Sequence, residues 1–339
     1  DVFPDPSYGL IGGFLVGGVV QICFQIPRLF RGTSTRFSLD LHLNDPGVRR
    51  VLWIMVPGVF AAGVYQVNVF VSQLIASTLD GGSIASLQFS VRLQELVLGL
   101  FVVSVAQVIL PTLASQTTEG DTDGVRSTLS HASRLMLYVT LPSTAALVVL
   151  GEPIVRLLFQ AGEFDETSTA MTVFALQFHA LGLLPIALAR VQQQVFYADK
   201  DLKTPTVIAA VVALVNIVLC IVLSRTELKH GGIALAGSIA ALVNTLAFVV
   251  PLRKKIGSLQ GLDLFWRGLR MGGATAVMVF ALIGYGLVWT APADRLALLP
   301  WVLLACVTGG AVYIATSALL RVNEFGGLLD AVRRRGARS

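Results

Sequence analysis

Charged residues are scarce in this chain. They make up 13% of its 339 residues, whereas hydrophobic residues make up 55%. A soluble domain of this length carries about a quarter charged residues. The deficit, together with repeated apolar runs of about 20 residues, excludes an ordinary soluble domain and predicts an all-α polytopic membrane protein. Alternation with a period of two is also absent, and lipid offers the backbone no hydrogen-bond partners, so we expect the spans to be helices.

Cysteines and catalytic motifs are few. Cys23, Cys220 and Cys306 lie inside apolar runs and are spaced for neither a metal site nor a disulfide framework, so we expect them to be small buried hydrophobic residues. The chain has no H-E-x-x-H, G-x-S-x-G, P-loop or C-x-x-C motif. Glu95 is the only clear carboxylate within the predicted spans, which leaves no second acid for paired acid–base chemistry. We therefore expect no enzyme, no cofactor and no metal site.

Nine apolar segments are long enough to cross a bilayer. Two further segments, 152–164 and 261–270, have apolar residues at helical spacing but are too short to span, so we expect amphipathic helices on the outer and inner surfaces. The predicted spans are 8–30, 51–77, 85–112, 134–151, 169–195, 205–224, 232–252, 271–290 and 298–320.

The lysines and arginines predict the orientation of these spans. With the N-terminus outside, most of the 25 basic residues fall in segments on the cytoplasmic side, and the outer segments hold only Arg156, Arg225, Lys229 and Arg295. The C-terminus is then cytoplasmic. The net charge of +5 comes from loops between spans, which favours anionic lipid head groups, and not nucleic acid, as its partner.

Polar residues inside the third span share one helical face. Gln88, Arg92, Glu95 and Gly99 are spaced at i, i+4, i+7 and i+11, and a charge in lipid is costly unless it faces water or a partner. The stripe therefore predicts the wall of a polar cavity, where the planar fork of Arg92 suits a phosphate. The alternative is a buried ion pair that fastens two helices.

Other intramembrane polar residues carry weaker signals. Gln66 and Asn68, in the preceding span, suit substrate contact and interhelical hydrogen bonding about equally. We expect His179 to be a core histidine with a hydrogen-bond partner, Arg190 to snorkel toward the membrane surface, and Asn216 to hold helices together.

Several blocks in chain order resemble the MurJ/MviN family of lipid II flippases. The block over 45–77 looks like the family's seventh helix, and the block over 92–121 looks like its eighth. The block over 152–176 is similar to the family's outer loop and tenth helix, and the block over 196–209 matches its F-Y-A-x-x-D-x-x-T-P turn. The fifth is similar to the twelfth helix. The blocks are DPGVRRVLWIMVPGVFAAGVYQVNVFVSQLIAS (45–77), RLQELVLGLFVVSVAQVILPTLASQTTEGD (92–121), EPIVRLLFQAGEFDETSTAMTVFAL (152–176), FYADKDLKTPTVIA (196–209) and GGIALAGSIAALVN (231–244).

The resemblance implies a fold of the MOP superfamily, with fourteen helices in two six-helix lobes and a final pair. The nine predicted spans would correspond to helices 6–14, with roughly five helices of the family lying before them. Residues 1–44 would be the last helix of the first lobe and a cytoplasmic linker, and 45–255 the second lobe. Residues 256–339 would be the final pair and a basic cytoplasmic tail.

The resemblance also implies a function. The family moves lipid II, the undecaprenyl-diphosphate-linked peptidoglycan precursor, from the inner to the outer leaflet of the bacterial inner membrane by alternating access. Arg92 would contact the diphosphate or sugar, Glu95 would orient Arg92 or break the contact during turnover, and 271–320 would form the groove for the lipid tail. Cell-wall synthesis and division proteins would be further partners. Ser72 and Cys220 stand near positions where some members place carboxylates for a cation, so sodium coupling there is not expected.

Two other functions remain open from the sequence. An exporter of another substrate, such as another lipid-linked oligosaccharide or a small cationic solute, belongs to the same superfamily, but a cation exporter predicts a cavity rich in acids and aromatic rings. A non-transporting membrane scaffold in cell-wall assembly would keep its function after every cavity charge is removed.

Overall fold

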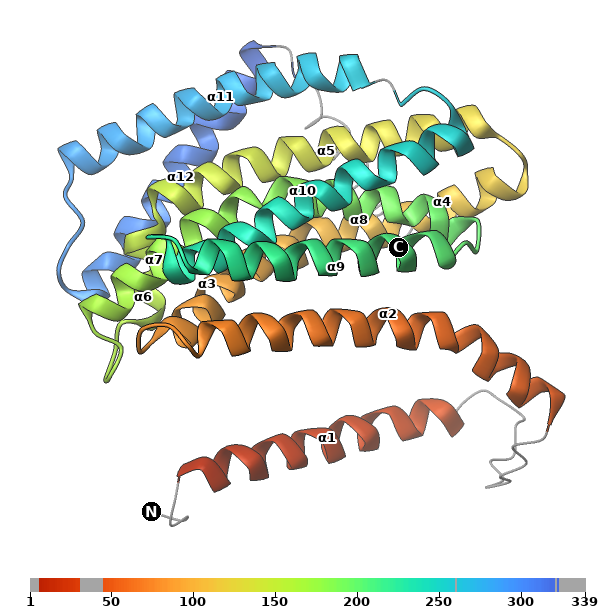
Figure 1. The fold of residues 1–339 in the computed structure, drawn as a ribbon. Coiled ribbons are helices and arrows are strands. Elements are labelled where there is room, and N and C mark those ends of the chain that lie inside the picture. Colours follow the sequence, from red (N-terminus) through yellow and green to blue (C-terminus); the bar gives the residue numbers. More distant parts are fainter. Residues whose placement is uncertain (1–5, 31–44, 260, 321, 323–339) are drawn as a thin grey trace. The chain divides into compact units, whose positions relative to one another are not determined.

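The structure, a computed structural model, describes residues 6–30, 45–259, 261–320 and 322, and every regular element in these ranges is a helix (Figure 1). It divides into two units, Asp1–Trp53 and Ile54–Ser339. The first holds α1 (Pro6–Phe30) and the first turns of α2 (Pro46–Ala76). Most of the predicted linker and the basic tail lie outside the described residues.

The second unit contains the remaining helices in short succession. They are α3 (Ser83–Val97), the π-helix η1 (Leu98–Val103), α4 (Ser104–Thr118), α5 (Thr122–Val149), α6 (Gly151–Phe159), α7 (Glu166–Leu181), α8 (Leu183–Ala198), α9 (Lys203–Ser224), α10 (Lys229–Ile256), α11 (Gly261–Val288) and α12 (Arg295–Leu319).

All nine predicted spans are helical in the parts that the structure describes, but not all are confirmed as crossings. Six helices are long and apolar enough to cross a membrane, and α7 with α8, bent by 42°, would make a seventh. In α1 and α2 the apolar stretches found are shorter, Ile11–Pro27 and Ala62–Ala76. The polytopic helical fold is therefore confirmed, and the count of nine is not.

The two segments predicted as short amphipathic helices differ in the structure. Residues of the first form the nine-residue helix α6. The prediction of a separate inner helix over 261–270 was wrong, because these residues are the first turns of α11. No proline interrupts α11, and Asp263 in its first turn accepts a hydrogen bond from Arg134 of α5 at 2.7 Å.

Large apolar side chains from α4, α5, α8 and α10 form the main core. Leu113, Met136 and Leu183 are fully buried in it, and the rings of Phe196 and Phe248 lie 5.4 Å apart between centroids. Among the cysteines only Cys220 is buried, whereas Cys23 and Cys306 are exposed, so the expectation of burial was wrong for two of the three. Exposed apolar groups on a membrane helix face lipid at no cost.

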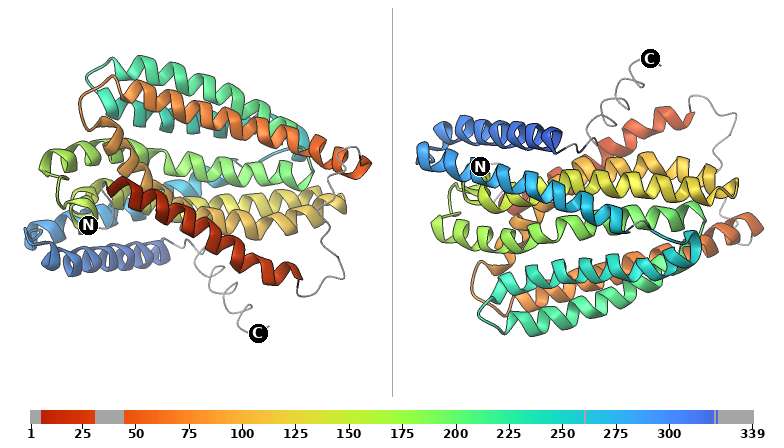
Figure 2. Two further views of the ribbon diagram at one scale, coloured as in Figure 1. Left: turned by 90° about the horizontal axis from the view of Figure 1, so that it is seen from below. Right: turned by 90° about the horizontal axis from the view of Figure 1, so that it is seen from above.

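The helices α11 and α12 form a hairpin that lies against α5 (Figures 1 and 2). Met271 and Trp301 bury their side chains there beside Tyr138. The hydroxyl of Tyr313 donates a hydrogen bond to the carbonyl oxygen of Tyr138 at 2.9 Å. The hairpin is thereby packed onto the lobe by both apolar contact and a buried hydrogen bond.

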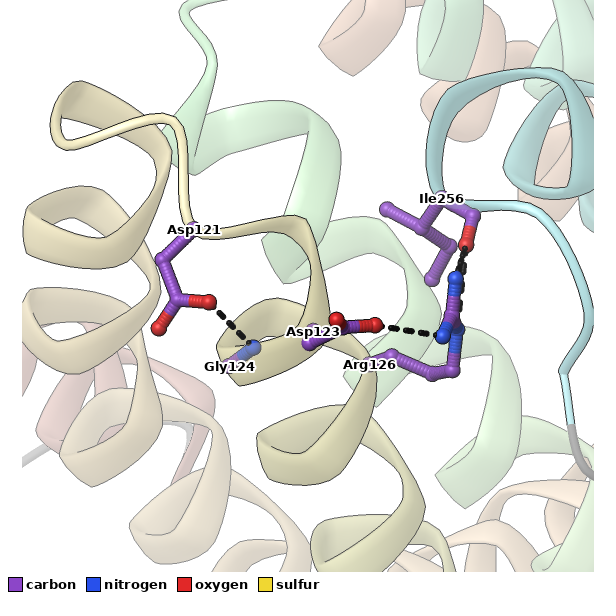
Figure 3. Close-up of polar contacts among 5 residues, drawn as sticks. All are labelled: Asp121, Asp123, Gly124, Arg126 and Ile256. Atoms are coloured by element: carbon purple, nitrogen blue, oxygen red, sulfur yellow. Dashed lines mark hydrogen bonds and ion pairs between the residues drawn. The ribbon is translucent and has the colours of Figure 1, made fainter.

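A polar junction joins the start of α5 to the end of α10 (Figure 3). The Asp121 carboxylate caps α5 by accepting a hydrogen bond from the Gly124 backbone N–H at 2.8 Å. Arg126 donates from Nε and Nη2 to the Ile256 carbonyl oxygen at 3.1 and 2.6 Å, and from Nη1 to Asp123 at 2.6 Å. A guanidinium at the C-terminus of α10 suits the negative end of the helix dipole.

The turn between α9 and α10 requires glycine at position 232. A Cβ atom there would lie 2.4 Å from the Leu223 carbonyl oxygen, and backbone does not yield easily. We expect Gly232→Ala to destabilise the protein by about 1–3 kcal/mol, measured as a lower Tm in detergent. Gly237→Ala is the control, because a Cβ there meets nothing within 4 Å. Equal melting temperatures for both variants would contradict the close approach.

An ion pair ties the α2–α3 loop to the same turn. The Lys229 Nζ lies 2.7 Å from Asp80 Oδ2, and the hydrogen bond and charge of Lys229 hold the pKa of Asp80 below its usual range. A lowered carboxyl pKa stabilises the fold above the unfolded value of about 4, and this stabilisation is lost as the pH falls through the folded value.

We therefore expect Asp80→Asn to flatten the loss of Tm between about pH 5 and pH 3. Both side chains are more than half exposed, so the effect is small and shrinks in high salt. Glu163→Gln is the matched control, because Glu163 forms no ion pair in the described part of the chain. Identical acid limbs for wild type and Asp80→Asn would rule out a role for the pair.

Candidate functional site

A hollow of about 440 Å³ lies within the second unit, among α2, α3, η1, α7, α8, α9 and α10. Apolar residues line part of it, and polar residues gather on the rest. The polar lining residues are Asn68, Ser72 and Gln73 of α2, Gln88, Arg92, Gln94 and Glu95 of α3, His179 of α7, Arg190 of α8, Asn216 of α9 and Ser238 of α10.

Arg92 and Glu95 form an ion pair on the wall of this hollow. Arg92 Nη1 lies 3.0 Å from Glu95 Oε2, and the side chains are 71% and 48% exposed. Because both residues belong to α3 and both are accessible, the alternative of a buried pair that fastens two helices is wrong. A guanidinium this exposed is free to bind an incoming anion.

Three of the four residues of the predicted polar stripe line the hollow. Gln88, Arg92 and Glu95 do so, but Gly99 does not. The α-helix ends at Val97 and Gly99 lies in η1, whose wider turns change the angular spacing of the residues. The wall therefore ends at Leu98, which lines the hollow in its place.

On α2, the structure separates the two candidates. Asn68 lines the hollow and its Oδ1 accepts a hydrogen bond from Asn216 Nδ2 at 2.9 Å, whereas Gln66 is exposed and does not line it. Asn216 thus holds helices together, as predicted. One turn along, Ser72 Oγ lies 3.7 Å from Cys220 Sγ. Among the described residues, no group of three or more histidines, cysteines or carboxylates is placed to hold a metal ion.

His179 is a core histidine with a partner, as predicted. Its Nδ1 lies 2.9 Å from Ser90 Oγ, and its side chain is almost fully buried at the edge of the hollow. Gln94 Nε2 donates to the His179 carbonyl oxygen. This carbonyl belongs to the last turn of α7, next to the bend at Gly182, and it also accepts a hydrogen bond from the Gly182 backbone N–H at 3.0 Å.

Arg190 is a lining residue that was not among the predicted cavity residues. It lines the same hollow as Arg92, and the expectation that it snorkels toward the membrane surface stays a prediction. His179, Ile186 and Arg190 are spaced at i, i+7 and i+11, and all three line the hollow. Because the 42° bend at Gly182 falls between His179 and the other two, helical spacing in the sequence does not place all three on one face.

A second hollow, of about 560 Å³, lies between α6 and α7 and includes Glu152, Arg156 and Glu166. Its arginine is already engaged. Arg156 lies 4.0 Å from Glu152 and donates to the carbonyl oxygens of Pro292 and Ala293 at 3.5 and 3.4 Å. We therefore place the candidate site in the first hollow.

The Asn68–Asn216 bond should be measurable as a coupling. We expect the double-mutant cycle of Asn68→Ala and Asn216→Ala to give about 0.6 kcal/mol, and no more than about 1.7 kcal/mol, of interaction energy in detergent unfolding. A control cycle pairs Asn68→Ala with Gly237→Ala. The Gly237→Ala substitution removes no hydrogen bond, so this cycle should show no interaction energy. Strict additivity in the first cycle would mean that the bond contributes nothing to the packing of α2.

Comparison with known proteins supplies the family. The family model described as "Lipid II flippase MurJ" matches residues 2–304. A probable lipid II flippase MurJ of Vibrio cholerae is 32% identical over 284 residues, which cover 82% of this chain and 53% of the relative. Lipid II flippase MurJ of Burkholderia cenocepacia is 32% identical over 254 residues, covering 74% of this chain and 49% of the relative.

Solved structures agree with the sequence relatives. A lipid II flippase MurJ in an inward closed conformation superposes with a TM-score of 0.73 and 25% identity, over 92% of this chain and 61% of that one. A MOP-superfamily transporter from Pyrococcus furiosus shares the fold, with a TM-score of 0.53 and 15% identity over 79% of this chain and 64% of its own. The chain spans about half the length of the curated relatives that it matches. The family match over residues 2–304, joined to relatives at about a third identity, shows that this chain belongs to the MurJ family of lipid II flippases.

Proposed function

We propose that this chain acts in lipid II translocation, moving the undecaprenyl-diphosphate-linked precursor from the inner to the outer leaflet by alternating access. The observation that carries the proposal is Arg92, an accessible guanidinium on the wall of a polar hollow inside a helical lobe. A guanidinium presents a planar fork of donors that matches phosphate oxygens in pairs. The family to which the chain belongs supplies the identity of the anion.

Glu95 competes with the diphosphate for Arg92, so the contact between Arg92 and the diphosphate can form and break. An exposed ion pair contributes only about 0–1 kcal/mol, so a diphosphate displaces the carboxylate from Arg92 at little cost. When the ligand leaves, the ion pair between Glu95 and Arg92 forms again. Gln88 and Asn68, on the same hollow, offer amide groups that suit the sugar hydroxyls of a lipid-linked saccharide.

The distribution of charge supports an orientation in the bacterial inner membrane with a cytoplasmic C-terminus. The end of α10 carries Arg253, Lys254 and Lys255, and the start of α11 carries Arg267 and Arg270. The opposite ends of the helices carry few basic residues. We propose that the basic ends face the cytoplasm, in keeping with the excess of lysine and arginine in inner loops.

We also propose that α11 and α12 contact the lipid tail. Their outward faces expose large apolar side chains, among them Phe280 at 74% and Leu287 at 78%. Such a surface suits a polyprenyl chain as well as it suits bulk lipid. The division into 1–44, 45–255 and 256–339 follows from the same assignment of a lobe and a final pair.

The charge of the hollow argues against an exporter of cationic solutes. Two arginines, Arg92 and Arg190, and one carboxylate, Glu95, line it. A cation would meet a surplus of like charge there. Likeness to a multidrug transporter of the same superfamily, at 16% identity and a TM-score of 0.54, extends to the fold alone.

The proposal predicts that Arg92→Ala abolishes growth in a strain depleted of its own lipid II flippase. The gene is expressed from its complete reading frame, and membrane amounts are compared by immunoblot. Arg225→Ala, on the exposed α9–α10 loop, is the control and should grow normally. Arg92→Lys keeps the charge but loses the fork, so we expect partial growth.

Two results would count against the proposal. Full growth with Arg92→Ala would remove Arg92 from the mechanism. Full growth after every charge of the hollow is neutralised would favour a scaffold in cell-wall assembly. Accessibility of lipid II on the outer leaflet, measured with an impermeant probe, separates lost translocation from lost assembly.

A further inference from the structure

A second arginine lines the hollow, and among the described residues its guanidinium has no partner. Arg190 belongs to α8, and within the part of the chain that the structure describes its guanidinium makes no hydrogen bond and no ion pair. Beside the hydrogen bonds of the helix itself, its backbone carbonyl oxygen accepts one from Gln194 Nε2 at 3.4 Å. The carboxylate of the hollow, Glu95, is paired with Arg92.

The two arginines lie at different depths. The helices α3 and α7 run parallel with a constant register, because Gly82 faces Met171 and Ser90 bonds to His179, with the same separation of 89 positions. Extended into α8, this register places Arg190 about nine residues beyond Arg92 along the wall. At 1.5 Å per residue, and allowing for the bend, the two Cα positions are offset by about 10–13 Å along the helix direction.

We propose that Arg190 is a second binding station for the anionic head group, separate from the station at Arg92. The inference rests on the proposed function for the chemistry of the ligand, a diphosphate on a polyprenyl tail. In the proposed orientation Arg190 lies nearer the cytoplasmic end of the hollow, so the diphosphate meets it first. The diphosphate then passes to Arg92, where Glu95 competes for the guanidinium and promotes release.

The chemistry of the two positions differs in the way that such a sequence requires. Among the described residues no carboxylate pairs with Arg190, so Arg190 holds an anion that arrives from the inner leaflet until the next station accepts it. Arg92 carries its competitor three residues away on the same helix. In the proposed orientation the diphosphate therefore meets the arginine without a competitor first and the arginine with a competitor second.

Binding measurements distinguish two stations from one. The complete protein in detergent is titrated with undecaprenyl diphosphate, and undecaprenol serves as the uncharged control for tail binding. If either station alone holds the head group, Arg190→Ala and Arg92→Ala each weaken binding only about two- to threefold. The double variant then loses more than about tenfold, which exceeds the product of the single effects.

Arg270→Ala is the matched control, because Arg270 is exposed at the same end of the helices and does not line the hollow. It should bind like the unmodified protein. Arg190→Gln keeps much of the side-chain length and replaces Arg190→Ala if the alanine variant melts early.

Three outcomes overturn the inference. Arg190 variants that bind like Arg270→Ala in both the wild-type and the Arg92→Ala background would mean that Arg190 contacts lipid head groups only. Single effects that multiply in the double variant would place both arginines on one shared site. Failure of the unmodified protein to bind undecaprenyl diphosphate better than undecaprenol would instead refute the proposed function, and the inference with it.

Discussion

The cost of placing charge and unpaired backbone in lipid governs the architecture of the second unit. Arginine and glutamate persist inside membrane helices only where water or a partner reaches them. The helices around the hollow meet this demand by departing from regularity. The track from α3 to α4 passes through the π-helix η1, and the track from α7 to α8 bends by 42° at Gly182. Both irregularities border the hollow that receives Arg92 and Arg190.

Close packing fixes the bend where it is. A Cβ atom on Gly182 would lie 2.7 Å from Ser238 Oγ and 3.1 Å from Gln94 Nε2. Side chains of α10 and α3 therefore pack closely against the backbone at the bend. Ser238 donates to the Phe178 carbonyl oxygen at 2.6 Å, and Gln94 donates to that of His179. Side chains of α10 and α3 therefore add hydrogen bonds to the backbone at the bend, where the His179 carbonyl oxygen also accepts from the Gly182 N–H.

The arginines of the second unit divide by the partners that they have. Arg126 and Arg134 are mostly buried and bind a backbone carbonyl and a carboxylate of neighbouring elements, and Arg295 donates to the carbonyl oxygens at the end of α6. These three hold α10, α11 and α12 to the rest of the lobe at both ends. Within the described ranges, Arg92 pairs only with Glu95 of its own helix, and the Arg190 guanidinium has no partner. Residues that lack a structural partner in a built hollow are the ones left for a ligand.

Much of this arrangement could be predicted from the sequence, because hydrophobic runs define helices in lipid and the i, i+4, i+7 spacing defines their faces. The stripe of Gln88, Arg92 and Glu95 was found in this way. The prediction that Gly99 lies on the same wall was wrong, because a π-helix leaves no clear mark in the sequence. The place of Arg190 in the hollow could not be predicted, because its apolar neighbours allow either a surface or a cavity, and tertiary packing decides between them.

The exposure of the Arg92–Glu95 pair connects the fold with the proposed translocation. Arg134 and Asp263 join two helices with the arginine largely buried, at 22% exposure, and such a pair resists exchange because breaking it strands a desolvated charge. Arg92 is 71% exposed, so its guanidinium keeps most of its hydration and loses little when Glu95 leaves. The same hydration lets a phosphate approach without first stripping a buried ion. A transporter needs contacts of this second kind along its path, since a site that binds too well would hold its cargo in place of passing it on.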